Sequence, residues 1–125
     1  MGIRKALLDT NILIDYLAGI AQARAEVERY AMPAISIITW IEVMAGATPD
    51  DEQVRRDFLA TFMVLPLTME VAERSSEIRR HRTPRLKVPD TIILATAQLD
   101  DLLLVTRNSK DFPAKERDVR IPNKL

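Results

Sequence analysis

Short apolar runs alternate with longer amphipathic segments along this chain of 125 residues. Runs rich in Leu, Val and Ile with little polar alternation are typical of strands buried in a parallel sheet, whereas the segments between them have helical spacing. The strands are expected at residues 5–8, 34–38, 63–67 and 102–106, with a short fifth at 119–121. The helices are expected at residues 12–17, 22–30, 39–46, 49–61, 69–81 and 89–100. This alternation predicts an α/β fold, and the absence of repeats and linkers predicts one domain over residues 1–125.

Polar side chains follow the expected strands at the points where the strands end. Asp9, Thr10 and Asn11 come directly after the first strand. Glu42 lies one turn into the helix after the second strand, and Asp90 opens a mostly apolar helix. In open parallel sheets, functional sites gather beyond the carboxyl ends of the strands. We therefore expect the three carboxylates to converge at one edge of the sheet.

The stretch "TRNSKDF" at residues 106–112 follows the fourth expected strand and brings more polar groups to the same edge. Thr106 and Asn108 would add neutral oxygens, and Asp111 would add another acid. Arg107 and Lys110 flank Asn108 with positive charge. This stretch is therefore expected to complete the polar site.

Carboxylates brought together without a counterion raise one another's pKa and lower stability, and a divalent cation removes that cost. An all-oxygen set of ligands favours a hard ion such as Mg²⁺ or Mn²⁺. Asp9, Glu42 and Asp90 are therefore the expected metal ligands. The residues expected to support them, by holding water or orienting the ligands, are Thr10, Asn11, Thr106 and Asp111.

Each acid also has a purely structural interpretation. Asp9 or Asn11 would suit the N-cap of the first helix. Thr39 and Glu42 have the spacing of a capping box, and Asp90 is an acid in a first helical turn, which the helix dipole favours. Taken together, these interpretations do not explain why the acids follow strand ends in an α/β chain, so the metal site is the preferred hypothesis.

Composition excludes several classes of function. The chain has no cysteine, which excludes disulfides, thiolate zinc sites and thiol nucleophiles, and it carries no net charge at pH 7. No apolar run approaches the roughly 20 residues that span a bilayer, and the first apolar stretch is too short for a signal peptide. We expect a cytoplasmic protein without membrane contact.

A local basic cluster stands out against this neutral total. Residues 79–87 read "RRHRTPRLK" and lie just before Asp90 in the chain. Cations near the acids would contact the phosphates of a nucleic acid. The residues expected to bind RNA are Arg82, Arg85, Lys87, Arg107 and Lys110.

Four segments resemble, in order, the signature segments of PIN-domain ribonucleases, and among these most closely the VapC toxins of bacterial type II toxin–antitoxin modules. The segments are "LLDTNILIDYL", "ISIITWIEVMAG", "VPDTIILATAQ" and "LLLVTRNSKDF", and they span residues 7–112. The resemblance implies a three-layer α/β/α fold with a central, mainly parallel sheet of four to five strands. It also implies Mg²⁺- or Mn²⁺-dependent cleavage of RNA by water, leaving a 5′-phosphate and a 3′-hydroxyl.

The resemblance also implies roles for individual residues. Asp9, Glu42 and Asp90 fall on the first three acids of the family. Asn108 stands where many members carry a fourth Asp, so the implied catalytic set is Asp9, Glu42, Asp90 and Asn108. Asp111, three residues on, is a substitute for the missing acid.

Two kinds of protein partner follow from the resemblance. VapC-like toxins are held by a cognate antitoxin protein and commonly form homodimers. Apolar residues of the helix expected at 49–61, with the residue that follows it, would serve either a dimer interface or the core; they are Phe58, Leu59 and Phe62.

Two other functions are consistent with parts of the sequence. A metal-dependent phosphotransferase of the dehalogenase type also carries an Asp after its first strand, although it usually has a second Asp where this chain has Asn11. A catalytically weakened PIN domain would act only as a partner-binding module.

Overall fold

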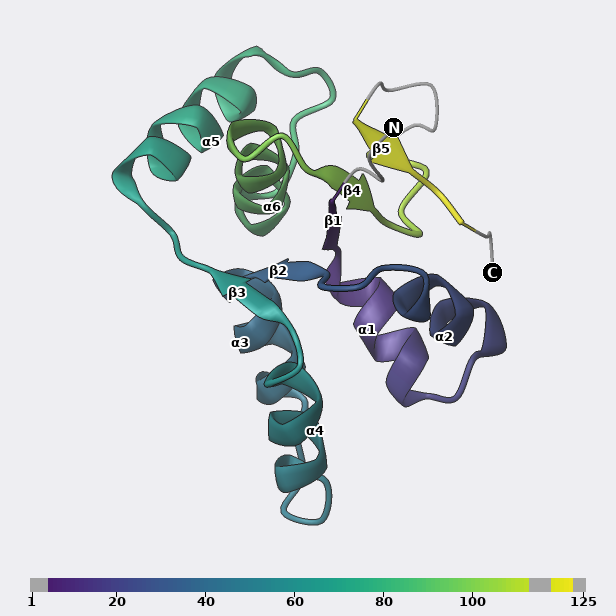
Figure 1. The fold of residues 1–125 in the computed structure, drawn as a ribbon. Helices are drawn as coiled ribbons and strands as arrows, with labels where there is room; N and C mark the ends of the chain where they lie inside the picture. The colour runs from purple at the N-terminus through teal and green to yellow at the C-terminus, as the bar shows by residue number, and fades with distance from the viewer. Residues whose placement is uncertain (1–4, 113–117, 123–125) are drawn as a thin grey trace.

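The computed structural model describes residues 5–112 and 118–122. Its centre is a parallel sheet in the order β3-β2-β1-β4-β5 (Figure 1). The strands are β1 (Ala6–Leu8), β2 (Ala34–Ser36), β3 (Met63–Leu65), β4 (Leu103–Val105) and β5 (Val119–Arg120). The predicted α/β fold and its parallel sheet are confirmed.

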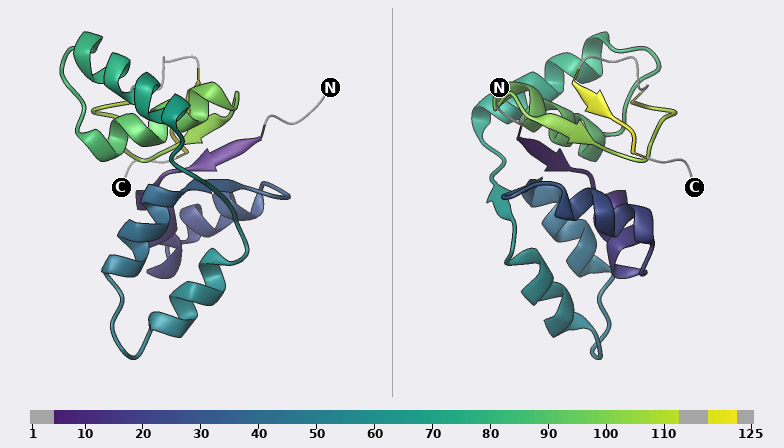
Figure 2. Two further views of the ribbon diagram at one scale, coloured as in Figure 1. Left: turned by 90° about the vertical axis from the view of Figure 1, so that its left-hand side faces the viewer. Right: turned by 45° about the vertical axis from the view of Figure 1, so that its right-hand side comes forward.

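Helices cover both faces of this sheet. The first four are α1 (Thr10–Leu17), α2 (Ala21–Glu28), α3 (Ile37–Ala45) and α4 (Glu52–Leu59), and they lie on one face. The other face carries α5 (Met69–His81) and α6 (Val88–Leu99). Figure 2 shows the two helical layers with the strands between them. Within the described residues, no helix is long and apolar enough to span a membrane.

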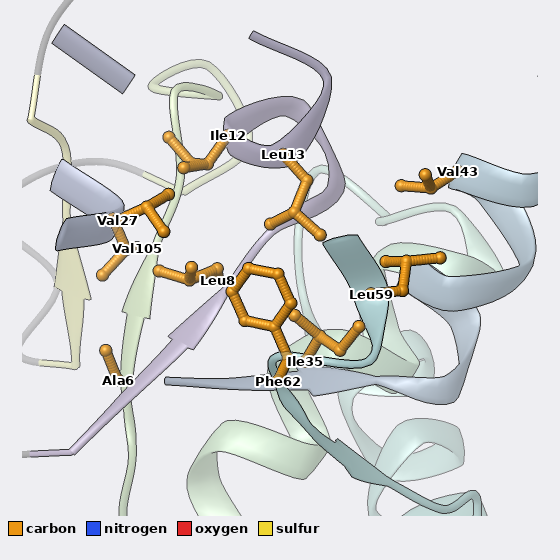
Figure 3. Close-up of a cluster of buried hydrophobic side chains, with 10 residues drawn as sticks. All are labelled: Ala6, Leu8, Ile12, Leu13, Val27, Ile35, Val43, Leu59, Phe62 and Val105. Atoms are coloured by element: carbon orange, nitrogen blue, oxygen red, sulfur yellow. The ribbon is translucent and has the colours of Figure 1, made fainter. Parts of the chain in front are cut away.

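The pleat of the strands divides the core between the two faces. Leu8 of β1 and Ile35 of β2 point into the cluster beneath α1 to α4 (Figure 3), whereas Leu7 and Ala34 point toward α6. Both sets are buried, because each face of the sheet is covered by helices. Burial on both sides thus explains the apolar character of β1 and β2, whereas Met63 and Val64 of edge strand β3 are exposed.

The boundary between β2 and α3 differs from the sequence prediction. The strand ends at Ser36, whose hydroxyl accepts a hydrogen bond from the backbone N–H of Ile38 (3.0 Å) and so caps α3. Thr39 therefore lies inside the helix, and the capping box proposed for Thr39 and Glu42 is wrong. Glu42 is left without a capping role.

Two other helices begin two or more residues away from the expected position, whereas α2 and α6 begin one residue earlier than expected. The first begins at Thr10 rather than Ile12, because Asp9 accepts from the Thr10 N–H (2.8 Å) and serves as its N-cap. The fourth begins at Glu52, and Thr48 and Asp51 form a hydrogen-bonded turn before it. The capping interpretation of Asp9 is therefore correct, although it does not exhaust the role of this side chain.

The apolar residues expected to serve either a dimer interface or the core, at positions 58, 59 and 62, pack inside the chain. Leu59 and Phe62 are buried in the same cluster as Leu8 and Ile35 (Figure 3). Phe58 stacks on Tyr16 with ring centroids 4.7 Å apart, and packs edge-on against Phe62. Of the two roles expected for these residues, the structure supports packing.

Candidate active site

The carboxyl end of β1 lies between those of its neighbours β2 and β4, where the strand order changes direction. Leu8 pairs with Val105, so the residues that follow, Asp9 and Thr106, lie side by side. The Asp9 N–H donates to the Val105 carbonyl (2.9 Å), and the Thr106 hydroxyl donates to Asp9 Oδ2 (2.7 Å). Parallel pairing thus places a buried carboxylate at the crevice where such sheets bind ligands.

Asn11 joins the start of α1 to the loop after β4. Its side-chain amide donates to Asp9 Oδ2 and to the Thr106 hydroxyl (3.3 Å each), and its Oδ1 accepts from the Arg107 N–H (3.0 Å). The Thr106 hydroxyl also accepts from the Asn108 N–H (3.0 Å). This network fixes the orientation of the Asp9 carboxylate from the start of α1 and from the residue after β4.

Glu42 approaches the same edge from α3. Its Oε1 accepts a hydrogen bond from the Thr10 hydroxyl (2.6 Å), which also lies 3.0 Å from the hydroxyl of buried Thr39. Glu42 itself is exposed, so its far oxygen has room to move. Thr10, which follows Asp9 in the chain and bonds to it, therefore connects Asp9 to Glu42 of α3.

Asp90 lies half-buried in the first turn of α6. A helix dipole alone would lower its pKa. Instead, burial and the negative charges of Asp9, Asp111 and Glu42 raise the pKa of Asp90 to about 6, and Lys87 offsets only part of this effect. The structure thus brings the predicted acids close enough to repel one another, which an isolated first-turn acid would not experience.

Burial is also the main reason that the pKa of Asp9 is raised, and the charge of Glu42 adds to the effect. The hydrogen bonds from Thr106, Thr10 and Asn11 oppose it. Protonation and cation binding are two ways to relieve this strain between carboxylates.

The donor set fits a hard divalent ion in chemistry, because its charged members are all carboxylates. Among the residues that the structure describes, no three Asp, Glu or His side chains are arranged to hold a metal ion as they stand. Asp9 has both oxygens hydrogen-bonded, whereas exposed Glu42 is held through Oε1 by Thr10. Closing the set around an ion therefore requires side-chain movement.

Residues 6–117 match the PIN domain family. The chain belongs to the PIN-domain family. The resemblance read from the four sequence segments is confirmed.

Individual relatives agree with this assignment. The chain is 32% identical over 117 residues to Ribonuclease VapC10 of Mycobacterium tuberculosis, covering 89% of this chain and 88% of the relative. It is 32% identical over 125 residues to Ribonuclease VapC1 of Methanocaldococcus jannaschii, covering 96% and 88%. A toxin-antitoxin complex from Klebsiella pneumoniae contains a chain with 46% identity and a TM-score of 0.90, covering 97% of this chain and 100% of that one. Membership of the PIN family goes against the dehalogenase-type alternative.

Asn108, which the resemblance places where many family members carry a fourth Asp, is hydrogen-bonded to Asp111 in this PIN domain. Asn108 Nδ2 donates to Asp111 Oδ2 (3.0 Å), and the Asp111 N–H donates to Asn108 Oδ1 (3.2 Å). The amide oxygen of Asn108 is thus already occupied. The charge that acts on Asp90 from this turn comes from Asp111.

Asp15 is a buried residue of the site region that sequence reasoning missed. Arg107 Nε and Nη2 donate to its two carboxylate oxygens (2.7 and 3.3 Å). Arg107, predicted to bind RNA, is therefore engaged in an ion pair within the PIN domain. The available signal was the position of Asp15, one helical turn after Asn11 on the same face of α1.

The remaining predicted RNA contacts lie around this edge in two groups. Asn11, Arg107, Asn108, Ser109 and Lys110 line a hollow of about 360 Å³. Arg82 donates to the carbonyl of Asp111 (3.1 Å), which ties the loop before α6 to the turn after β4. Arg85 and Lys87 are exposed in that loop, and Arg85 lines a different hollow on the side of α5.

Proposed function

We propose that this protein is a cytoplasmic, Mg²⁺- or Mn²⁺-dependent endoribonuclease and the toxin of a toxin–antitoxin pair. The observation that carries the proposal is the gathering of four acids, Asp9, Glu42, Asp90 and Asp111, at the carboxyl edge of the sheet, where burial and the other three charges raise the pKa of Asp90. Such repulsion lowers the stability of the empty site and is relieved when a cation binds. The arrangement supports a cation site better than it supports four unrelated helix-capping acids.

Asp9 and Asp90 would hold the ion, with Glu42 as the third carboxylate. When bound, a divalent ion would neutralise these charges, polarise the phosphodiester and lower the pKa of a bound water toward neutrality. Asn108 and Asp111 would act from the neighbouring turn, with Asp111 supplying the charge that Asn108 lacks.

The surrounding residues orient these acids. Thr106 and Asn11 both bond to Asp9 Oδ2, which limits the rotation of that carboxylate. Thr10 bonds to one oxygen of Glu42, so the other oxygen is the one available to accept a proton from an attacking water. Removal of a residue that orients a metal ligand in this way typically lowers metal affinity by about 10- to 100-fold.

An RNA strand would enter through the hollow beside Asn108. Its lining residues, including Asn11 and Lys110, are polar or charged. Lys110 is exposed and Lys87 acts electrostatically on Asp90, so both cations lie near the acids. Cations at these positions would contact phosphates on either side of the bond that is cut.

The names of the relatives support the biological setting. Two are named ribonucleases, and the similar Klebsiella pneumoniae chain comes from a toxin-antitoxin complex. We extend from this to a cognate antitoxin that covers the acidic edge. Homodimerisation is part of the same proposal, and the exposed apolar residues of edge strand β3 and of the segment after it offer a surface for it; they are Met63, Val64 and Leu67.

The test is cleavage of a panel of structured and single-stranded RNAs with Mg²⁺ or Mn²⁺ added to metal-free protein. Asp90→Asn is compared with Asp100→Asn, which changes an exposed acid at the opposite end of the same helix. We expect metal-dependent cleavage by the wild type and Asp100→Asn, and at least a hundredfold loss in Asp90→Asn. Equal cleavage by both variants would refute the site, whereas metal binding without cleavage of any RNA would favour a partner-binding module.

A further inference from the structure

A basic hollow lies between α5 and the loop that leads to Asp90, and it is used by no part of the mechanism above. Ser76, Arg79 and Arg80 of α5 and Arg85 of the following loop line a space of about 270 Å³. Three of the four residues that line this depression are therefore arginines. This group is called the arginine hollow below.

The arginine hollow is partly prearranged. Arg79 Nη1 donates to the carbonyl of Leu86 (2.6 Å), which holds a half-buried guanidinium in place and ties the loop to α5. Arg80 and Arg85 are exposed, and neither forms an ion pair with another residue that the structure describes. Two charged groups are therefore available to an outside ligand.

The dipole of α5 does not account for this arrangement by itself. Cations are favoured in the last turn of a helix, which suits Arg79 and Arg80. Arg85 lies outside the helix, four residues after its end at His81, and still lines the same hollow. The convergence of helix and loop residues points to a ligand with negative charge.

The hollow lies at the same end of the molecule as the acids. The carboxyl end of α5 is next to the amino end of α6, as the contact between Arg79 and Leu86 shows, and α5 and α6 lie side by side (Figure 1). Asp90 is five positions after Arg85, so their Cα atoms are at most about 18 Å apart. A short single-stranded segment that passes the acids can reach the hollow.

We propose that the arginine hollow binds a backbone phosphate of the RNA a few nucleotides from the bond that is cut. The planar guanidinium fork suits phosphate oxygens, and contacts of this kind position a strand without reading its sequence. This inference rests on the proposed ribonuclease function and adds to it a substrate contact outside the cleavage centre.

The experiment measures binding of a labelled twelve-nucleotide single-stranded RNA of mixed sequence in EDTA, where no divalent ion is available. The double variant Arg80→Ala/Arg85→Ala is compared with Arg74→Ala, an arginine of the same helix that lines a different hollow with Gln98 and Asp101. We expect the double variant to bind about tenfold more weakly, and its slope of log affinity against log salt to fall by about 1. The Arg→Lys double variant should retain the slope, because it retains the charge.

Two outcomes would overturn the proposal. The double variant could bind RNA with the same affinity and salt slope as Arg74→Ala, or the wild type could fail to bind RNA. A double variant that keeps its RNA affinity but no longer binds purified antitoxin would assign the hollow to a protein partner instead. Weaker binding by the double variant, in a protein that cuts no RNA with Mn²⁺, would support the phosphate contact and refute only the proposed catalysis.

Discussion

Arg107 and Asp15 form a bidentate ion pair that joins the loop after β4 to helix α1. The Asp15 side chain is 8% exposed and that of Arg107 is 33% exposed. The backbone N–H of Arg107 donates to Asn11, which in turn bonds to Asp9. The pair thus supports the orientation of the first acid from outside the site.

Asp15→Asn should lower the free energy of unfolding by about 2 kcal/mol. Removing one partner of a buried pair costs about 3–5 kcal/mol, and the partial exposure of Arg107 reduces this figure. Urea unfolding measures the change. Glu52→Gln is the control, because it breaks an exposed pair with Arg56 and should change stability by about 0.5 kcal/mol or less. Equal effects of the two substitutions would contradict the structural role of Asp15.

Asp90 makes the stability of the metal-free protein depend on pH. Its pKa is about 6 in the folded protein and 3.8 as the ordinary value, so the folded state holds this proton more tightly than the unfolded state. Stability should therefore fall as pH rises from about 4 to about 6, and the loss should persist above that range. Because Asp90 is half-exposed, the effect should be about 1–2 kcal/mol rather than the full shift.

Urea unfolding in EDTA at pH 4, 5, 6 and 7 tests this dependence. Asp90→Asn should become more stable than the wild type as pH rises, and Mg²⁺ at pH 7 should stabilise the wild type alone. A difference between wild type and variant that stays constant across this range would show that Asp90 does not titrate there.

The sequence predicted the class of fold and the edge of the sheet at which the acids gather, because strand ends in a parallel sheet are set by local apolar runs. The first residue of a helix cannot be chosen from local sequence where two nearby residues both suit the N-cap. Ser36 and Thr39 are both good N-cap residues, and only the three-dimensional path of the chain selects Ser36.

Pairings between distant residues were beyond sequence reasoning. Asp15 and Arg107 are 92 positions apart, and nothing in the local pattern of either residue identifies the other. Likewise, the choice between core and interface for Phe58 depends on the position of Tyr16 in a different helix. Such choices require the packing of whole elements to be known.

Thr106→Val should weaken metal binding by roughly tenfold, since it removes the hydroxyl that orients Asp9 and that lowers its pKa. The measurement is Mn²⁺ binding by calorimetry. Thr96→Val is the matched control, because Thr96 is also buried but its hydroxyl donates to the carbonyl of Ile92 in its own helix rather than to an acid. Unchanged affinity in Thr106→Val would mean that the hydroxyl does not orient a metal ligand.

Arg120 of β5 donates hydrogen bonds from Nε and Nη2 to the two carboxylate oxygens of Glu26 in α2 (2.7 and 3.1 Å). The Tyr30 hydroxyl donates to the same carboxylate (2.8 Å). Burial and this bond to Glu26 raise the pKa of Tyr30 to about 12. In Glu26→Gln, Tyr30 should ionise nearer to its ordinary value of 10.0, which the absorbance of tyrosinate reports.

The same substitution tests the stability of this contact. Burial raises the pKa of Glu26, but bonds from Arg120 and Tyr30 and the arginine charge lower it more, so the net shift is downward. The stability that Glu26 contributes is therefore present above pH 4.5 and should be lost as pH falls below that value. A Glu26→Gln variant with wild-type stability at pH 7 would show that the contact contributes nothing.

The most direct test of the account is calorimetric titration of Mn²⁺ into metal-free protein at pH 7. The wild type and Asp100→Asn should bind the ion alike, and Asp90→Asn should bind it at least tenfold more weakly, because it lacks a carboxylate of the site. No binding by the wild type at millimolar Mn²⁺, or equal binding by all three proteins, would contradict the claim that the acids at the carboxyl edge form a metal centre.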